Sequence, residues 1–152
     1  VKAASLLEMA KKNNVNLIVP QDSVNSRAFV DNEDYVISDS KSIPEGLIGL
    51  DIGPKTIREF KNIISKSKTI VWNGPMGVFE FKNFSTGTKE VAKAVASVTK
   101  KGAFSLVGGG DSISALKKFD LSSEVSYVST GGGAMLHFLE TKKLPAVQAI
   151  LD

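Results

Sequence analysis

The sequence predicts an α/β protein in which an open parallel sheet carries helices on both faces. Short runs of β-branched and aromatic residues alternate along the chain with segments of helical periodicity. Two of those runs end in triple-glycine loops that lead directly into a helical segment. The chain has 152 residues, of which 42% are hydrophobic and 23% charged, and this suits one domain with its own core.

Composition excludes several classes of function. The chain has no cysteine, which rules out a disulfide framework, a thiolate zinc site and a cysteine nucleophile. Its apolar runs are far shorter than the ~20 residues that span a bilayer, so we expect no membrane partner. The formal charge of +3 rests on scattered lysines and two arginines, and we therefore expect no nucleic-acid partner.

The first element is a helix in which apolar residues recur from Ala3 to Ala10, and Asn13–Asn14 ends it. Neither a methionine nor a capping residue precedes this helix, so we expect the chain to be a fragment whose earlier strands are missing. The branched run Val15–Val19, which Pro20 ends, predicts a buried strand.

A looser segment follows. Ser26–Val30 and Tyr35–Ser38 are expected to pair across the turn Asp31–Asp34, and Ile43–Ile52 continues as a broken extended piece. Pro54 suits the first position of a helix and opens the next one, which has one apolar face.

The remainder is regular. The expected strands are Thr69–Trp72, Ala103–Val107 and Val125–Ser129. One expected helix begins near Thr88 and ends before Gly102, and two more cover Ser112–Phe119 and Ala134–Glu140. A last helix begins at Pro145, with Val147, Ile150 and Leu151 turned inward. Strands that alternate with helices imply crossover connections, so we expect an open α/β sheet of Rossmann-like character.

Three loops leave the carboxyl ends of successive strands: Asn73–Gly77, Gly108–Asp111 and Thr130–Gly133. Ligands bind at that edge of an open parallel sheet. Glycine loops at helix starts expose backbone N–H groups to an anion, so the expected ligand is a phosphate. The alternative for each loop is a tight connection without a ligand. Neither of the two triple-glycine loops is a Walker A sequence, and neither has the dinucleotide fingerprint.

Side chains near these loops sharpen the expectation. Asp111 suits a magnesium ion beside bound phosphates and Ser112 suits a phosphate oxygen, although both also fit an ordinary first helical turn. Glu80 suits ribose hydroxyls, or is a surface residue. His137 has no acidic partner in sequence and is interpreted as structural, and Trp72 as packing.

These motifs together resemble those of one family. The run Val71–Glu80 (VWNGPMGVFE) resembles the signature of phosphoglycerate kinase. Gly108–Ser112 resembles the nucleotide-phosphate loop of that family, and Ser129–Ala134 its transfer-site loop. Gly49–Pro54 and Leu144–Pro145 also fit. The resemblance covers residues 1–152 as the latter part of the nucleotide-binding domain, without the amino-terminal domain that binds the acceptor.

The resemblance implies reversible phosphoryl transfer between 1,3-bisphosphoglycerate and ADP, with Mg²⁺ as cofactor. The residues that it assigns to ADP or ATP are Gly49, Leu50, Asn73, Pro75, Val78, Glu80, Gly109, Gly110, Asp111 and Ser112, with Asp111 also on the metal. Gly131, Gly132 and Gly133 would stabilise the phosphoryl group in transfer. Phosphoglycerate would bind through the missing domain, so we expect this chain alone to be inactive. The resemblance further implies a cytoplasmic enzyme that is monomeric at full length.

Three residues depart from the family pattern: Met135 stands where serine is common, His137 where an acidic residue is common, and Thr141 in place of glutamate or glycine. These three departures bear on the fine positioning of residues after the last glycine loop, and not on the family resemblance itself. The alternative function is a non-catalytic nucleotide-binding α/β module. A dehydrogenase-like domain is disfavoured because the dinucleotide fingerprint is missing.

Overall fold

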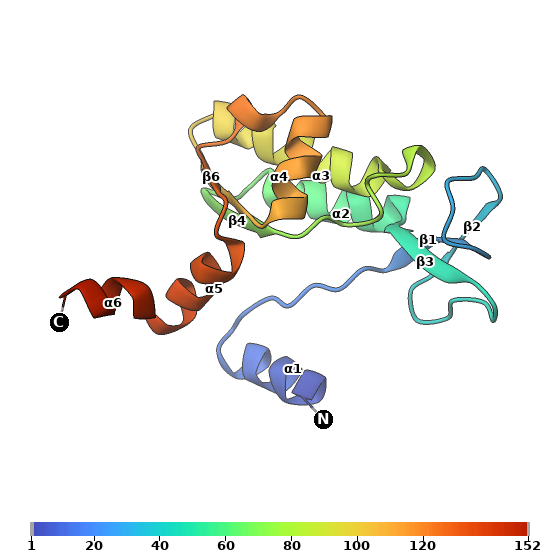
Figure 1. Ribbon diagram of the computed structural model, residues 1–152. Coiled ribbons are helices and arrows are strands. Elements are labelled where there is room, and N and C mark those ends of the chain that lie inside the picture. The colour runs from blue at the N-terminus through green and yellow to red at the C-terminus, as the bar shows by residue number, and fades with distance from the viewer. Residues whose placement is uncertain (1, 152) are drawn as a thin grey trace.

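A computed structural model describes residues 2–151 of the chain (Figure 1). The strands are β1 (Asp22–Ser26), β2 (Tyr35–Asp39), β3 (Ile48–Ile52), β4 (Thr69–Asn73), β5 (Phe104–Gly108) and β6 (Tyr127–Ser129). The α-helices are α1 (Lys2–Lys12), α2 (Pro54–Ile64), α3 (Thr86–Lys100), α4 (Gly110–Lys118), α5 (Gly132–Thr141) and α6 (Pro145–Leu151), and two short 3₁₀ helices are η1 (Lys82–Phe84) and η2 (Ser122–Glu124).

The strands form two sheets of three. The first is antiparallel with the order β2-β1-β3, and the second is parallel with the order β4-β5-β6. α3 connects β4 to β5 and α4 connects β5 to β6, which is the alternation that a parallel sheet requires. The expected α/β class, with an open parallel sheet of Rossmann-like character, is confirmed.

The core lies between the parallel sheet and three helices. Trp72 of β4 and Val107 of β5 are cross-strand partners that point to the same face of the sheet. Val91 and Val95 of α3 pack on them, as does Leu116 of α4. Phe60 and Ile64 of α2 lie against the same cluster. Each of these helices repeats an apolar residue every three or four positions, which gives it one face to bury.

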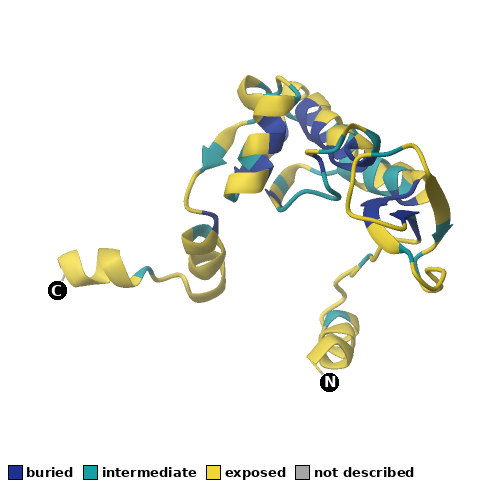
Figure 2. Cartoon of the chain, turned by 45° about the vertical axis from the view of Figure 1, so that its right-hand side comes forward, coloured by how far each residue is buried: buried dark blue, intermediate teal, exposed yellow. Residues whose placement is uncertain are grey.

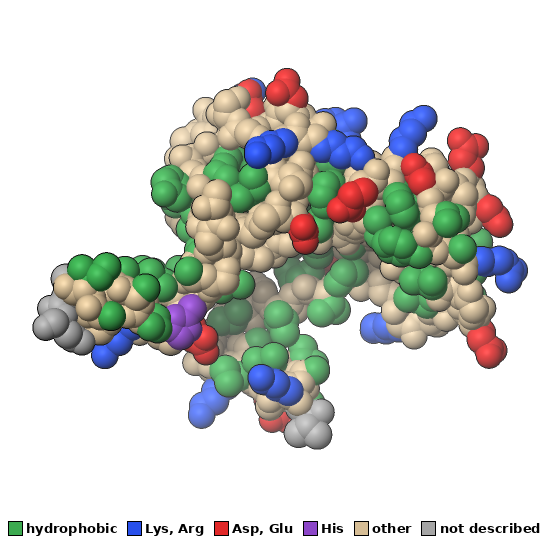
Figure 3. All heavy atoms as spheres, viewed as in Figure 1, with side chains coloured by type: hydrophobic (Ala, Val, Ile, Leu, Met, Phe, Trp, Pro, Cys, Tyr) green, Lys and Arg blue, Asp and Glu red, His purple; other side chains and the backbone are tan. Residues whose placement is uncertain are grey.

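The opposite face of the parallel sheet is open. Val71, Leu106 and Tyr127 form one row across the three strands, and Phe104 lies on the same side. Val71, Phe104 and Tyr127 are 45%, 50% and 61% exposed. Helices α2, α3 and α4 thus cover one face only, whereas we expected helices on both. In Figure 2 the buried residues lie in the body formed by the sheets and their helices, whereas α1 and α6 are almost entirely exposed. Figure 3 shows hydrophobic side chains around the hollow beside α1 and α5.

One predicted strand is wrong. Val15–Val19 is not a strand and is not buried, since Val15 and Val19 are each 59% exposed. A strand needs a hydrogen-bonding neighbour, and among the described residues β4 pairs only with β5. Leu17 and Ile18 instead border an apolar groove beside β4.

The expected hairpin forms with shifted bounds. Its first strand is Asp22–Ser26 instead of Ser26–Val30, and Ser26 faces Tyr35 across the turn. Asp22 and Ser23 are polar yet buried, so hydrophobicity could not mark the start of this strand.

The two terminal helices are present but lack buried faces. No residue of α1 is buried. The prediction that Val147 and Ile150 of α6 turn inward is wrong, because they are 49% and 83% exposed, and the side chain of Leu151 lies outside the described residues. No described part of the chain forms a helix long and apolar enough to cross a membrane.

Candidate functional site

The three loops singled out in the sequence meet at the carboxyl edge of the parallel sheet. Asn73, Gly108 and Ser129 occupy one row across β4, β5 and β6. A Cβ atom placed on Gly132 would lie 2.6 Å from the Cα of Gly109 and 3.2 Å from Nδ2 of Asn73. The starts of α4 and α5 therefore touch through their backbones, with the Asn73 side chain beside both.

The first turn of α4 is held to the loop after β4. Ser112 is fully buried, and its Oγ accepts the Gly74 N–H at 2.7 Å. Gly109 precedes the helix with a φ of +92°, a conformation that favours glycine. The loop bends because glycine is there, and the Ser112 hydroxyl fixes the bend against β4. The Ser112 hydroxyl thus has a structural partner in the loop after β4.

Asp111 lies in the first turn of α4 with its carboxylate exposed. No hydrogen bond or ion pair engages that carboxylate within residues 2–151, and these residues contain no cluster of three acidic, histidine or cysteine side chains suited to a metal. One free carboxylate beside a glycine loop at a helix start fits Mg²⁺, which is usually held by one or two carboxylates together with substrate phosphates and water.

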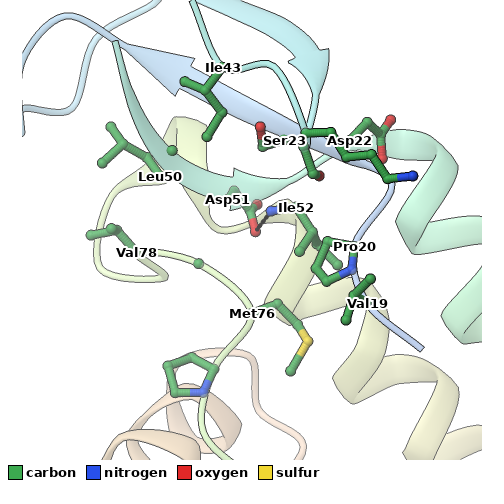
Figure 4. Close-up of a pocket in the computed structure, with 15 residues that line it drawn as sticks. Val19, Pro20, Asp22, Ser23, Ile43, Leu50, Asp51, Ile52, Met76 and Val78 are labelled. Carbon is green, nitrogen blue, oxygen red and sulfur yellow. Dashed lines mark hydrogen bonds between the residues drawn. The ribbon is translucent and has the colours of Figure 1, made fainter. Parts of the chain in front are cut away.

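A second part of the site is a cavity of about 620 Å³ between the antiparallel sheet and the loop after β4 (Figure 4). Gly49 and Leu50 of β3 line one side, and Pro75 and Val78 the other. The Val78 N–H donates to the Leu50 carbonyl at 2.8 Å, which joins the two sides. The four residues expected at the nucleotide from these two segments are thus brought together.

Two side chains fix the loop that carries Pro75 and Val78. Thr88 of α3 is fully buried, and its Oγ1 accepts the Met76 N–H at 3.0 Å and the Gly77 N–H at 3.3 Å. Lys118 of α4 donates to the carbonyl oxygens of Phe79 and Glu80 at 2.8 and 2.9 Å. The Glu80 side chain is exposed and does not line the cavity, so the structure does not bring it to Leu50.

The remaining sequence interpretations concern single residues. Trp72 is 5% exposed and its indole N–H donates to the Gly74 carbonyl at 2.7 Å, which confirms a packing residue. The end of the Met135 side chain lies where a Cβ on Gly108 would stand, 2.4 Å from that position. The Met135 side chain, one of the three that depart from the family pattern, therefore packs against Gly108 at the end of β5. His137 is exposed on α5.

With the site described, the family can be stated. A family model described as "Phosphoglycerate kinase" matches residues 1–142. The chain belongs to the phosphoglycerate kinase family.

Curated and solved members of the phosphoglycerate kinase family align over nearly the whole chain. A phosphoglycerate kinase of Thermosipho africanus is 53% identical over 99% of the chain. A relative named "Phosphoglycerate kinase, cytosolic" from Triticum aestivum is 45% identical over 97% of it. The solved phosphoglycerate kinase of Coxiella burnetii superposes with a TM-score of 0.87 at 40% identity over 97% of the chain. The chain spans 38%, 37% and 37% of these proteins, respectively.

Sequence reasoning missed two buried carboxylates in the antiparallel sheet. Asp22 of β1 accepts the backbone N–H groups of Lys55 and Thr56 at 2.9 and 2.8 Å, and also the Thr56 hydroxyl at 2.7 Å. Burial opposes its charge, but these hydrogen bonds, with that of the Thr56 hydroxyl first among them, hold the pKa of Asp22 below its usual value. Asp22 therefore caps the start of α2, although it precedes Thr56 by 34 residues in the chain.

Asp51 of β3 does the same for α3. Its two oxygens accept the Ile52 N–H at 2.8 Å and the Gly87 N–H at 2.7 Å. The signal for it was a single acidic residue inside the apolar run Ile48–Ile52, because a charge buried in a strand needs partners.

Proposed function

We propose that the chain provides the nucleotide half of a phosphoglycerate kinase, which transfers a phosphoryl group reversibly between 1,3-bisphosphoglycerate and ADP in glycolysis. The observation that carries the proposal is the meeting of Asn73, Gly109 and Gly132 at one sheet edge. That meeting brings two helix starts together, where anions bind. Family membership supplies the reaction.

In this proposal the cavity beside β3 takes the nucleoside. Leu50 is buried in one wall and Val78 stands opposite, so the two offer apolar surface to the base. Gly49 and Pro75 complete these walls, and Glu80 reaches the ribose hydroxyls from the rim once a nucleotide is bound.

The phosphates lie at the glycine loops. Asn73, Gly109, Gly110 and Ser112 bind the phosphates of ADP or ATP, and Asp111 holds Mg²⁺ together with phosphate oxygens. The metal would neutralise charge on the phosphate oxygens. Gly131, Gly132 and Gly133 direct N–H groups of the α5 start at the phosphoryl group in transfer. No covalent intermediate on the protein is required, so alignment and charge stabilisation are the tasks of these loops.

The acceptor binds elsewhere. Phosphoglycerate carries a carboxylate and a phosphate, which planar arginine forks recognise best. The two arginines of the chain, Arg27 and Arg58, are exposed and lie outside the three loops. We therefore assign residues 1–152 to the latter part of the nucleotide-binding domain and the acceptor to an amino-terminal domain. We infer a cytoplasmic enzyme that is monomeric at full length, and relatives named cytosolic support that location.

The test is a chimera that separates catalysis from simple nucleotide binding. The chain replaces the matching 38% of the Thermosipho africanus phosphoglycerate kinase, and turnover is followed in a coupled assay. We expect turnover within about tenfold of the parent, a loss of no more than about 1.4 kcal/mol in transition-state stabilisation. The chain alone should give none. A folded chimera that binds MgADP without turnover would favour the alternative, a non-catalytic nucleotide-binding module.

A further inference from the structure

Asp51 lies between the two walls of the cavity that the nucleoside is proposed to occupy. It follows Leu50 in β3, and in Figure 4 its carboxylate points from the strand toward the loop that carries Met76 and Val78. A Cβ on Gly77 would stand 2.3 Å from Oδ1 of Asp51 and 2.6 Å from the Leu50 carbonyl oxygen. The backbone of the opposite wall therefore packs directly on this carboxylate.

The same carboxylate reaches the first turn of α3. Ser85 stands at the N-cap of α3 but makes no side-chain cap, and Asp51 accepts the Gly87 N–H in its place. The next residue, Thr88, accepts the N–H groups of Met76 and Gly77. Asp51 thus joins strand β3 to the start of helix α3, and Thr88 joins that helix start to the loop of Val78.

This arrangement keeps a charge where a charge is unfavourable. Asp51 is 6% exposed and no lysine or arginine forms an ion pair with it among the described residues. Burial raises the pKa of Asp51 from 3.8 to about 6, against the lowering effect of the Gly87 and Ile52 N–H groups. At neutral pH the side chain is ionised and accepts both hydrogen bonds. Stability alone does not account for a buried carboxylate that lacks a cation.

We propose that Asp51 is a positioning residue that sets the separation of Leu50 from Val78, and with it the width of the nucleobase end of the pocket. The inference rests on the proposed nucleotide site. Asp51 also lines the cavity, but each of its two oxygens accepts a backbone N–H. It acts by holding the α3 start, and through Thr88 the loop of Val78, at a fixed distance from β3.

The neighbourhood makes the ionisation of Asp51 separable from that of other groups. The segment Met76–Val78 and the first residues of α3, Thr86 to Thr88, contain no titratable side chain. From β1, Asp22 is the nearest acid, and its carboxylate is bound to the α2 start. Lys41 lines the same cavity and forms no ion pair with Asp51.

The experiment compares the full chain with Asp51→Asn, using metal-free ADP as the probe. An amide accepts one of the two N–H groups and turns its own donors toward the other. We expect the variant to bind ADP about tenfold more weakly at pH 8, as for one lost hydrogen bond to a charged group. At pH 5.5 the wild-type carboxyl is largely protonated and resembles the amide, so the ratio of the two affinities should fall toward one. Titration of ADP itself cancels in that ratio.

Hydrogen exchange of the Val78 amide, measured without ligand, tests the geometry independently of binding. Its bond to the Leu50 carbonyl should open more often in Asp51→Asn, with exchange about tenfold faster at pH 8. Ser105→Ala is the matched control. It removes a buried hydroxyl that accepts the Ser126 N–H and shares a hydrogen bond with the Thr99 hydroxyl, and none of these residues lines the cavity. Both readouts should stay unchanged.

The outcomes separate the two proposals. An ADP affinity and a Val78 exchange rate in Asp51→Asn within twofold of the wild type would overturn the inference and leave the nucleotide site standing. A pH-independent affinity ratio, or an equal effect in Ser105→Ala, would also overturn it. A folded wild-type chain that fails to bind ADP overturns the proposed function, whereas the exchange measurement still decides whether Asp51 holds the two walls.

Discussion

The backbones of Gly132 and Gly109 touch, because a Cβ on Gly132 would stand 2.6 Å from both the N and the Cα of Gly109. This contact brings the start of α5 to the start of α4. Two backbone N–H clusters at helix starts thereby share one edge of the parallel sheet, with Asn73 beside them. The contact is possible only while position 132 lacks a side chain.

Gly132→Ala tests this contact. The added methyl group meets backbone atoms of Gly109 that cannot rotate away, so the start of α5 must shift from the start of α4. We expect a loss of about 1–3 kcal/mol in the free energy of unfolding, as for other overpacked sites. Urea denaturation measures it. Gly133→Ala is the control, since a Cβ there meets nothing within 4 Å, and equal stability of the two variants would contradict the contact.

Gly110→Val separates ligand binding from folding. A Cβ on Gly110 also meets nothing within 4 Å, and the residue is exposed. We expect stability within about 1 kcal/mol of the wild type. The branched side chain, however, would stand where a phosphate approaches the α4 start, so affinity for ADP should fall at least about tenfold. Calorimetry with unchanged ADP affinity would show that the phosphate lies elsewhere.

Asp111→Ala addresses the metal. With the carboxylate gone, affinity for MgADP should fall about tenfold, equal to about 1.4 kcal/mol. Affinity for ADP in the presence of a chelator should not fall and should rise slightly, because Asp111 repels phosphates when no cation lies between them. Calorimetric titrations with and without Mg²⁺ give both numbers. The same loss in the two conditions would remove Asp111 from the metal.

Asp51 should make the chain less stable as pH rises through its range. Its pKa is 3.8 when exposed and about 6 in the folded chain, so folding takes up a proton between these values. Stability from this group is therefore greatest below pH 4 and is lost by about pH 6. Relative to Asp51→Asn, the wild type should be about 2 kcal/mol less stable at pH 7.5 than at pH 4.5. Urea denaturation at the two pH values measures this, and a constant difference would contradict the raised pKa.

The sequence predicted what local patterns determine. The strand Thr69–Trp72, the helix at Pro54 and the glycine loops depend on neighbours within a few residues, and all are present. Asp51 was not predicted as part of the site because its partner Gly87 is 36 residues away, and no short pattern links them. Lys118 is linked to Phe79 over 39 residues in the same way.

The failures have a different cause. Val15–Val19 has the composition of a buried strand, but composition records a side-chain preference and not the presence of a hydrogen-bonding neighbour. Val147 and Ile150 have the spacing of a buried helix face, yet no described segment packs on them. Both errors concern elements whose burial depends on a partner surface, which the local sequence does not encode.

The central claim is that the edge formed by Asn73, Gly109 and Gly132, with the cavity beside Leu50, is a magnesium-nucleotide site. A calorimetric titration of the full chain with MgADP tests it most directly. The account predicts one site per chain with a Kd below about 1 mM, equal to about −4 kcal/mol. The affinity should fall in Gly110→Val. No binding at that concentration by a chain whose circular dichroism shows it folded would contradict the account.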